Sequence, residues 1–431
     1  MTVRTIIGAG FALALLAGCA EEEIILPGER LDIRDAPVFV NQVADVSLPA
    51  ARANADWTHR NGGADHLISH PALGASLTAA FVAPIGEGDS LRARITADPV
   101  VADGIVYTLD ARTTVTATSV TGQTVWTRTL PTGLDNRADA SGGGVSVAGG
   151  QVFVTTGFGD ISALDSMTGT INWTQDLDAP ALSPPTINGD LVYVVARDSS
   201  GWALDVTNGR IRWQISNNPS TANFSGSASP ATNGNIVVFP FPSGEVVATF
   251  PQGGQRRWAS AVTGDRLGRA AALVTDITSD PVIDGQRVYV GNFGGRTAAL
   301  NLLDGERIWT ASEGAISPVW PVGNAVFLIN DISQLVRLDA QSGEPVWRVA
   351  LPDIVGERKA RQREFVGHYG PILAGGRLIV ASTDGLIRQF DPASGALVRT
   401  LALPGGAASH PVVAGQTLYV VSKSGQLHAF R

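Results

Sequence analysis

Three of the six histidines in this chain lie close together near its start, where they raise the question of a metal site. They are His59, His66 and His70, separated by seven and four residues. These spacings match no strong metal signature, and carboxylate residues are not arranged around them as further ligands. We therefore predict that this stretch is a structured loop without a bound metal.

Aspartate residues recur at regular places, but their setting is structural rather than catalytic. Asp165, Asp205, Asp339 and Asp391 each begin an Asp-x-x-x-Gly pattern. This pattern is typical of a tight turn in which the carboxylate accepts backbone N–H groups and the glycine adopts a positive φ. No cluster of acidic and amide side chains stands out as a calcium site. We predict no catalytic residue, no metal and no cofactor.

The chain has a single cysteine, Cys19, and it lies where a processing enzyme could use it. Arg4 precedes an apolar run, Ile6–Leu16, that is too short to span a bilayer. The following Leu16-Ala17-Gly18-Cys19 resembles the lipobox of bacterial lipoproteins. That resemblance implies cleavage before Cys19 and its acylation, and in such lipoproteins Ala20 at the next position implies sorting to the outer membrane. An ordinary signal peptide with an incidental cysteine is the alternative.

The chain divides into three predicted parts. Residues 1–18 form the lipoprotein signal peptide, residues 19–55 lack any repeat and form a lipidated tether, and residues 56–431 form the folded domain. No later run of eighteen apolar residues follows. A lipid anchor would hold such a domain at a membrane without a transmembrane helix.

Composition excludes several classes of function. The net charge of −8 and the lack of a basic stripe interleaved with aromatic residues argue against a nucleic-acid partner. With no cysteine after Cys19, the domain has no disulfide, no iron–sulfur site and no C-x-x-C-H haem attachment. The 49 glycines and 24 prolines suit many short strands joined by turns.

One stretch, ALDSMTGTINW at Ala163–Trp173, returns along most of the chain with variations. Its copies recur about every 40–50 residues, a period that indicates a β-propeller or another repeat array. A large aromatic side chain at a fixed place in each copy is expected to pack between neighbouring blades. Six copies end in such a residue: Trp126, Trp173, Trp213, Trp258, Trp309 and Trp347.

Counting the copies predicts an all-β fold, an eight-bladed propeller with four antiparallel strands in each blade. Seven full blades fall at about 95–130, 142–177, 182–216, 228–262, 278–312, 315–351 and 368–403. The last residues, His410–Arg431, supply three strands, and the isolated strand Leu77–Ile85 supplies the missing fourth. The N-terminal strand is thus expected to close the last blade and remove its open edge.

The repeat resembles the tryptophan-docking motif of the pyrroloquinoline-quinone (PQQ) dehydrogenase propellers, in which eight blades surround a quinone and Ca²⁺. The vicinal cysteine pair and the haem attachment of those enzymes are missing here. A lipobox, a tether and a bare ring of this repeat together resemble the BamB family of outer-membrane assembly lipoproteins. This second resemblance implies a non-enzymatic scaffold of the β-barrel assembly machinery, anchored at the periplasmic face of the outer membrane. It is expected to be monomeric apart from that complex.

The BamB resemblance also implies a partner, the POTRA domains of BamA, and a set of contact residues. A family Asp-x-Asp run falls on Asp276-Ile277-Thr278, and a family Leu-x-Leu-Arg-Gly segment falls on Ala222–Gly226. Asp276, Phe224 and Gly226 fit these patterns, whereas Thr278 and Ser225 depart from them. All five residues are predicted to lie at the partner contact. Asp276 as a loop-capping carboxylate is the alternative for that position.

Other functions remain open from the sequence. Exposed blade edges could add a strand of a nascent outer-membrane protein by β-augmentation. Arg358, Lys359, Arg361 and Arg363 form a basic cluster in the long connection Asp353–Tyr369, which would contact a partner or remain a solvated loop. The alternatives to the scaffold are a membrane-anchored quinoprotein dehydrogenase and a propeller that binds a glycan or another envelope protein.

Overall fold

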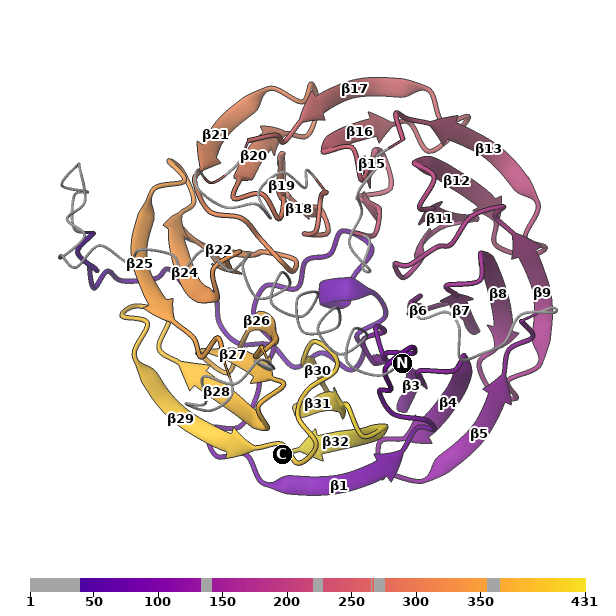
Figure 1. The fold of residues 1–431 in the computed structure, drawn as a ribbon, viewed down its shortest axis with the longest axis horizontal. Helices are drawn as coiled ribbons and strands as arrows, with labels where there is room; N and C mark the ends of the chain where they lie inside the picture. Colours follow the sequence, from indigo (N-terminus) through magenta and orange to yellow (C-terminus); the bar gives the residue numbers. More distant parts are fainter. Residues whose placement is uncertain (1–38, 133–141, 220–227, 265, 267–275, 355–364) are drawn as a thin grey trace, which may run out of the picture. The chain divides into compact units, whose positions relative to one another are not determined.

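The described part of the chain is a ring of β-sheets. The computed structural model describes residues 39–132, 142–219, 228–264, 266, 276–354 and 365–431. Within the compact unit Asn41–Arg431, the strands form eight four-stranded antiparallel sheets, and Figure 1 shows them arranged as blades around a central axis. The predicted eight-bladed propeller is confirmed.

The strands of each blade follow one another along the chain. Blade 1 contains β2 (Val100–Ala102), β3 (Ile105–Leu109), β4 (Thr114–Ser119) and β5 (Thr124–Thr129), and blade 2 contains β6 (Val145–Ala148), β7 (Gln151–Thr155), β8 (Asp160–Asp165) and β9 (Ile171–Asp176). Blade 3 contains β10 (Thr186–Asn188), β11 (Leu191–Val195), β12 (Ser200–Asp205) and β13 (Ile211–Ser216). Blade 4 contains β14 (Ala231–Thr232), β15 (Val237–Pro240), β16 (Glu245–Thr249) and β17 (Arg256–Ala261). Blade 5 contains β18 (Val282–Asp284), β19 (Arg287–Gly291), β20 (Thr297–Asn301) and β21 (Arg307–Ala311). Blade 6 contains β22 (Trp320–Val322), β23 (Ala325–Ile329), β24 (Gln334–Asp339) and β25 (Pro345–Ala350). Blade 7 contains β26 (His368–Ala374), β27 (Arg377–Ser382), β28 (Leu386–Phe390) and β29 (Leu397–Ala402).

Blade 8 joins the two ends of the folded unit. It contains β30 (Val412–Ala414), β31 (Thr417–Ser422) and β32 (Gln426–Phe430) from the C-terminus and β1 (Ala79–Pro84) from the N-terminal side. β1 pairs antiparallel with β32, with Val82 opposite His428, and lies at the rim of the ring (Figure 1). The expectation that an N-terminal strand closes the last blade is confirmed.

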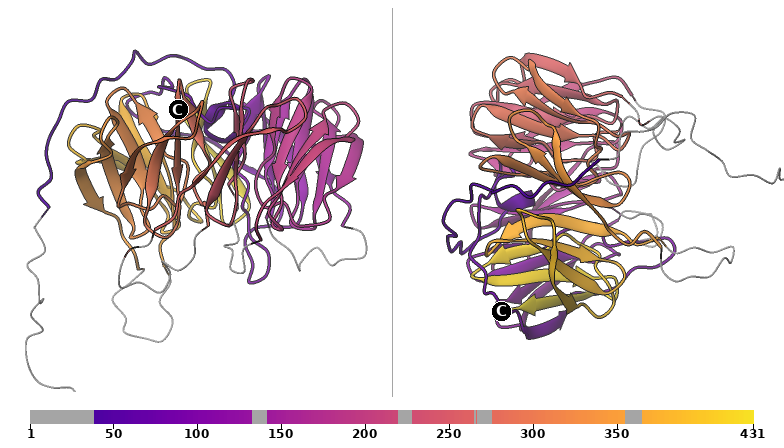
Figure 2. Two further views of the ribbon diagram at one scale, coloured as in Figure 1. Left: turned by 90° about the horizontal axis from the view of Figure 1, so that it is seen from above. Right: turned by 90° about the vertical axis from the view of Figure 1, so that its left-hand side faces the viewer.

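The ring has two different ends. The short turns that join the first and second strands of each blade lie at one end, which we call the turn end. The connections that run from the outermost strand of one blade to the first strand of the next lie at the other, which we call the loop end. Figure 2 (left) shows the N-terminal segment (indigo) crossing the turn end.

The segment that crosses the turn end holds one short helical element. This 3₁₀ turn, η1 (Arg60–Gly62), is the only helix among the residues that the structure describes. It lies near the axis of the ring (Figure 1). In the described residues, no helix is long and apolar enough to cross a membrane.

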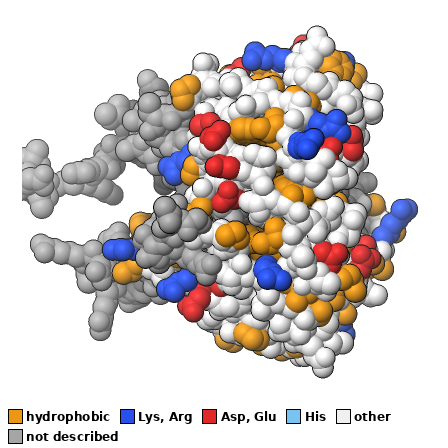
Figure 3. Space-filling view, turned by 90° about the vertical axis from the view of Figure 1, so that its right-hand side faces the viewer, with side chains coloured by type: hydrophobic (Ala, Val, Ile, Leu, Met, Phe, Trp, Pro, Cys, Tyr) orange, Lys and Arg blue, Asp and Glu red, His pale blue; other side chains and the backbone are white. Residues whose placement is uncertain are grey.

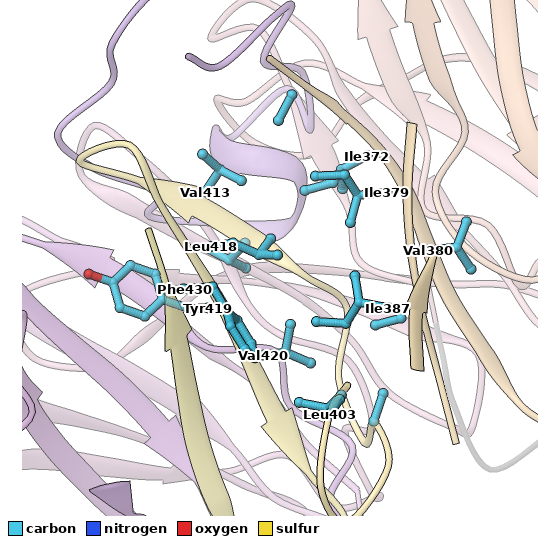
Figure 4. Packing of buried hydrophobic residues seen from close by; sticks show 14 of the residues in the cluster. Ile372, Ile379, Val380, Ile387, Leu403, Val413, Leu418, Tyr419, Val420 and Phe430 are labelled. Atoms are coloured by element: carbon cyan, nitrogen blue, oxygen red, sulfur yellow. The ribbon is translucent and has the colours of Figure 1, made fainter. Parts of the chain in front are cut away.

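Apolar side chains fill the spaces between blades. Where the ring closes, Ile379 and Ile387 of blade 7 face Leu418 and Val420 of blade 8, and all four are fully buried (Figure 4). Full burial of such a side chain stabilises a fold by about 1.5–3 kcal/mol. Successive side chains of a strand point to opposite faces of its blade, so they pack against the neighbouring blades on the two sides.

Candidate functional site

The repeated tryptophans form one recurring contact between neighbouring blades. Each indole ring covers the glycine of the next blade's turn: a Cβ built on Gly209 would lie 2.4 Å from Trp173 Cε3. Each indole Nε1–H also donates to the carbonyl three residues before that glycine, as from Trp173 to Val206 at 3.1 Å. The same bond runs from Trp126 to Ser166, Trp213 to Pro251, Trp258 to Leu302, Trp309 to Ala340 and Trp347 to Pro392.

The turn aspartates cap the same turns. The carboxylate of Asp165 accepts the N–H groups of Met167 and Thr168 at 3.1 and 2.8 Å. Asp205, Asp339 and Asp391 accept corresponding N–H groups two or three residues ahead. The glycine that ends the turn has a positive φ, 68° at Gly169, which L side chains rarely adopt. These carboxylates are therefore occupied by the repeat itself.

The closing blade uses other residues for the same contact. Phe81, on β1, lies over Gly122 of blade 1, in the place that a tryptophan has at six of the other seams. On blade 7 the tryptophan position holds Arg399, whose guanidinium donates to Ala75 O at 3.3 Å. Arg377 donates to the same carbonyl and to Gly74 O. Two cations thus replace the indole N–H where the chain supplies no Asp-x-x-x-Gly turn.

The N-terminal segment 54–71 touches every blade at the turn end. Its backbone bonds to the first strands of blades 1, 2, 4 and 5, Trp57 to Val101, Thr58 to Val147, Ala64 to Thr232 and Asp65 to Ile283. It also bonds to the turns that follow the first strands of blades 7 and 8, Pro71 to Gly375 and Asn54 to Gly415. For blade 3 the contact is from His59 to Ile187, and for blade 6 the rings of Trp57 and Trp320 stack at 6.2 Å. This segment therefore closes the central channel at that end.

The three clustered histidines fix this segment to the ring. His59 Nε2 accepts the N–H of Ile187 at 3.1 Å, and His70 Nε2 accepts the N–H of Gly376 at 2.8 Å. His66 Nδ1 donates to Pro281 O at 2.9 Å. Burial lowers the pKa of His59 to about 3, with a further contribution from His66, so its imidazole is neutral at pH 7. No group of three or more metal-ligating side chains occurs in the residues that the structure describes.

A cavity of about 290 Å³ lies within the ring and opens toward the loop end. Its lining includes the side chains of Ile95, Phe293 and Tyr369 and the polar side chains of Arg60 and Thr278. Arg60 comes from η1 and forms ion pairs with Asp98 at 3.0 Å and with Asp280 at 3.9 Å. His410 Nδ1 lies 3.0 Å from the other Asp98 oxygen, and its ring contacts Tyr369 edge-on.

The electrostatics of this cavity come from its own residues. Burial favours the neutral form of Asp98, but Arg60 and His410 outweigh it and hold the pKa of that carboxyl below its usual range. Burial, with Asp89 and Asp98, raises the pKa of the Tyr369 hydroxyl to about 12. Across the neutral pH range, the cavity therefore has a neutral Tyr369 in its lining, and the ionised Asp98 lies beside it, paired with the lining residues Arg60 and His410.

The Ca²⁺ of the dehydrogenase propellers does not fit this donor set. Ca²⁺ takes six to eight oxygen ligands, several of them carboxylate. Asp280 in the lining and Asp98 beside it both pair with Arg60, and Asp280 also accepts the N–H of Ser229 at 2.5 Å. The described lining offers no unengaged acidic cluster for a divalent cation.

The predicted partner residues fall in two groups. Asp276 and Thr278 lie at the loop end just before β18, but Asp276 is only 4% exposed and Thr278 donates to Ala315 O at 2.6 Å. Phe224, Ser225 and Gly226 lie outside the described residues, as do Cys19 and the basic cluster Arg358–Arg363. The structure thus places Thr278 at the mouth of the central cavity, beside residues that sequence reasoning did not connect with it.

The rim of the ring shows no large patch of one charge on the face seen in Figure 3. There, acidic, basic and apolar side chains alternate over the described outer strands. Exposed apolar side chains on these strands are scattered, with Val125, Ile211 and Ile308 between 42% and 50% exposed. Single exposed apolar residues are normal on a soluble surface and indicate no site by themselves.

Comparisons with known proteins agree with this geometry. The family model of the outer membrane protein assembly factor BamB matches residues 102–349 and 333–431. The BamB protein of Shewanella oneidensis is 24% identical over 354 residues, covering 80% of this chain and 86% of the relative. The Escherichia coli protein of the same name is 23% identical over 336 residues, covering 77% and 83%.

Solved structures share the propeller fold. BamB from Moraxella catarrhalis superposes with a TM-score of 0.68 at 18% identity, covering 83% of this chain and all of that one. A europium-containing methanol dehydrogenase superposes with a TM-score of 0.64 at 14% identity, covering 87% of this chain and 98% of that one. At such identities the superpositions show the fold alone, so the family model decides the assignment. The chain belongs to the BamB family of outer membrane protein assembly factors.

Proposed function

We propose that this protein is a non-enzymatic lipoprotein scaffold of the β-barrel assembly machinery at the outer membrane. The observation that carries the proposal is the BamB family match, which covers blades 1 to 8 apart from Val100, Val101 and β1. The central cavity supports it, because the carboxylates there are engaged by Arg60. Such a protein would act by position rather than by chemistry.

The anchor in this proposal is an acylated Cys19. Acyl chains would hold the ring at the periplasmic face of the outer membrane, and tethering two proteins to one membrane raises their effective concentration for each other. The segment that contacts the ring begins at Asn41, since Gln42 N donates to Val346 O on β25 at 2.9 Å. The chain between Cys19 and Asn41 would then serve as the spacer between bilayer and ring.

The partner in this proposal is BamA, docked through its POTRA domains on the loop end of the ring. Long connections on a rigid scaffold are common recognition elements. Asp276 and Thr278 lie at this end, and because Asp276 is buried and Thr278 is bonded to Ala315, they would act by shaping the loop surface that the partner contacts. Exposed outer strands would be available to nascent outer-membrane proteins by β-augmentation.

The test is recovery of BamA with the full-length lipoprotein from membranes in mild detergent, with partners identified by mass. We expect stoichiometric BamA with the natural protein and about tenfold less with Phe224→Ala or Asp276→Ala, a loss of about 1.4 kcal/mol. Asp339→Ala is the matched control, because it removes a turn-capping carboxylate from the turn end.

Three results would count against this proposal. Full recovery of BamA with both variants would remove the site assignment. A clean preparation without BamA would remove the partner, and capture of another envelope protein or a glycan would favour a different binding function. Quinone absorbance and bound Ca²⁺ after reconstitution would favour the dehydrogenase.

A further inference from the structure

The loop that connects β1 with β2, from Ile85 to Ile95, carries the most exposed large apolar side chain in the described residues. Leu91 is 98% exposed, whereas the other exposed large apolar side chains are 38–78% exposed. The loop joins the outermost strand of blade 8 to the first strand of blade 1, and it projects from the loop end of the ring (Figure 2, left).

This loop is held rigidly although its tip is exposed. Asp89 N donates to Lys423 O at 2.7 Å, and the Asp89 carboxylate accepts the N–H of Ile95 at 2.8 Å. Ser90 N donates to Ala93 O at 2.8 Å, and Ala93 N donates back to the Ser90 hydroxyl at 3.1 Å. The tip is therefore a closed turn whose backbone directs Leu91 outward.

The nearest apolar side chains before and after Leu91 in this loop, Ile85 and Ala93, are buried, whereas Leu91 is exposed. Ala93 is fully buried and Ile95 is 4% exposed, so the loop folds its other apolar side chains into the ring. Because hydrogen bonds already order the backbone of this turn, a partner that binds Leu91 would have to order only its side chain. Apolar anchors of this kind, inserted into a partner's pocket, supply much of the energy of protein interfaces.

The loop also adjoins the surface used in the proposed function. Ile95 and Thr96, at its C-terminal end, line the same central cavity as Thr278 and Asp280. Leu91 therefore stands on the end of the ring where the partner is proposed to dock, on the blade 8–blade 1 side of the cavity mouth. A domain that covers that mouth could reach both sides.

The charges around Leu91 favour a protein over a lipid surface as the occupant. Glu87 and Asp89 precede it, Arg92 and Arg94 follow it, and Arg94 pairs with Asp89 at 3.4 Å. A balanced set of charges gains little from anionic headgroups, and one leucine is a small apolar surface for a bilayer. A pocket in a protein can enclose a single leucine completely.

We propose that Leu91 is an anchor for the partner domain on the loop end, inserted into an apolar pocket of that domain. This rests on the proposed function for the identity of the partner. It adds a contact on the blade 8–blade 1 side of the ring to those predicted at residues 224–226 and 276–278.

Two measurements on the full-length lipoprotein test the anchor. Leu91→Ser is expected to lower BamA recovery by about tenfold without changing the melting temperature, because the side chain has no contact to lose in the free protein. The matched control is Leu397→Ser on β29, a leucine that is 53% exposed at the rim. A photo-reactive amino acid at position 91 is expected to cross-link to BamA, and one at position 397 is not.

The outcomes separate the anchor from the proposed function. Failure of the natural protein to recover BamA overturns the proposed function and this partner assignment together. Normal recovery of BamA with both the natural protein and Leu91→Ser, and no cross-link from position 91, overturns the anchor alone. A cross-link from position 91 to a different protein or to lipid also overturns it.

Discussion

At the scale of single residues, the contact between a tryptophan and a turn glycine sets the spacing of the blades. Trp173 covers Gly209 with its ring and bonds to the Val206 carbonyl, so one side chain supplies both apolar area and a directed bond. The residue opposite the tryptophan on the neighbouring strand is alanine in most blades, as Ala163 is opposite Trp173. A small side chain there leaves room for the indole.

Replacing the glycine should test that contact. Gly209→Ala places a Cβ 2.4 Å from the ring of Trp173 at a φ of 70°. Gly104→Ala imposes a similar strain, at a φ of 74°, but its Cβ meets nothing within 4 Å. We expect Gly104→Ala to cost about 1–2 kcal/mol and Gly209→Ala about 1–3 kcal/mol more. Equal losses in urea unfolding would show that the indole contact contributes little.

Two departures from the repeat have structural reasons. Arg337 stands where most copies have alanine, is buried, and donates to the carbonyls of Ala44 and Asp45. Arg337 therefore holds residues 44–45 to the seam between blades 6 and 7. Phe81 replaces a tryptophan at the closing seam. The sequence shows both substitutions, but only the folded ring shows their partners.

At the scale of elements, the N-terminal segment 54–71 contacts all eight blades. Its histidines serve as acceptors and donors for backbone groups that would otherwise lie buried without a partner. The neutral imidazole is required for this at His59, because protonation of Nε2 would remove the acceptor for the Ile187 N–H. Burial also lowers the pKa of His66 below its usual value.

The lowered pKa of His59 makes the free energy of unfolding depend on pH between about pH 3 and pH 6.5. Below about pH 6.5 the unfolded chain binds a proton at His59, whereas the folded chain does not until about pH 3. The free energy of unfolding should therefore fall as pH drops from 6.5 to 5, by about 1.4 kcal/mol per pH unit for this group. Urea unfolding at several pH values measures the slope, and His59→Gln should reduce it. An unchanged slope in that variant would contradict the assignment.

At the scale of the whole molecule, one ion-pair group connects distant parts of the ring. Arg60 on the N-terminal segment pairs with Asp98 before blade 1 and with Asp280 before blade 5. These three side chains are at most 11% exposed. Such a group contributes little net stability over apolar residues, but removal of its cation leaves charges buried without compensation.

Arg60→Met should therefore destabilise the ring strongly. We expect a loss of about 3–5 kcal/mol in the free energy of unfolding, because Asp98 and Asp280 would lose their shared partner. Adding Asp98→Asn to that variant should restore part of the loss by removing one buried charge. Thermal and urea unfolding of the three proteins check this. A mild effect of Arg60→Met alone would mean that water reaches these carboxylates.

The sequence alone determined the blades, because each one is a local unit. Alternation of apolar residues and a turn that ends in glycine recur about every 40–50 residues, and in six copies a tryptophan follows four places after that glycine. The number of copies then sets the number of blades, and the unpaired strands at the two ends require each other. These features depend on spacing along the chain, which a sequence displays directly.

The tertiary structure decided what lies at the centre and at the two ends of the ring. Residues 54–71 follow no repeat, so nothing in their spacing indicates that they contact eight blades or that Arg60 meets Asp98 and Asp280. Leu91 and Asp276 both lie in inter-blade connections, yet one is 98% exposed and the other 4%. Exposure depends on which distant segments fold over a residue, and that is fixed only when the ring closes.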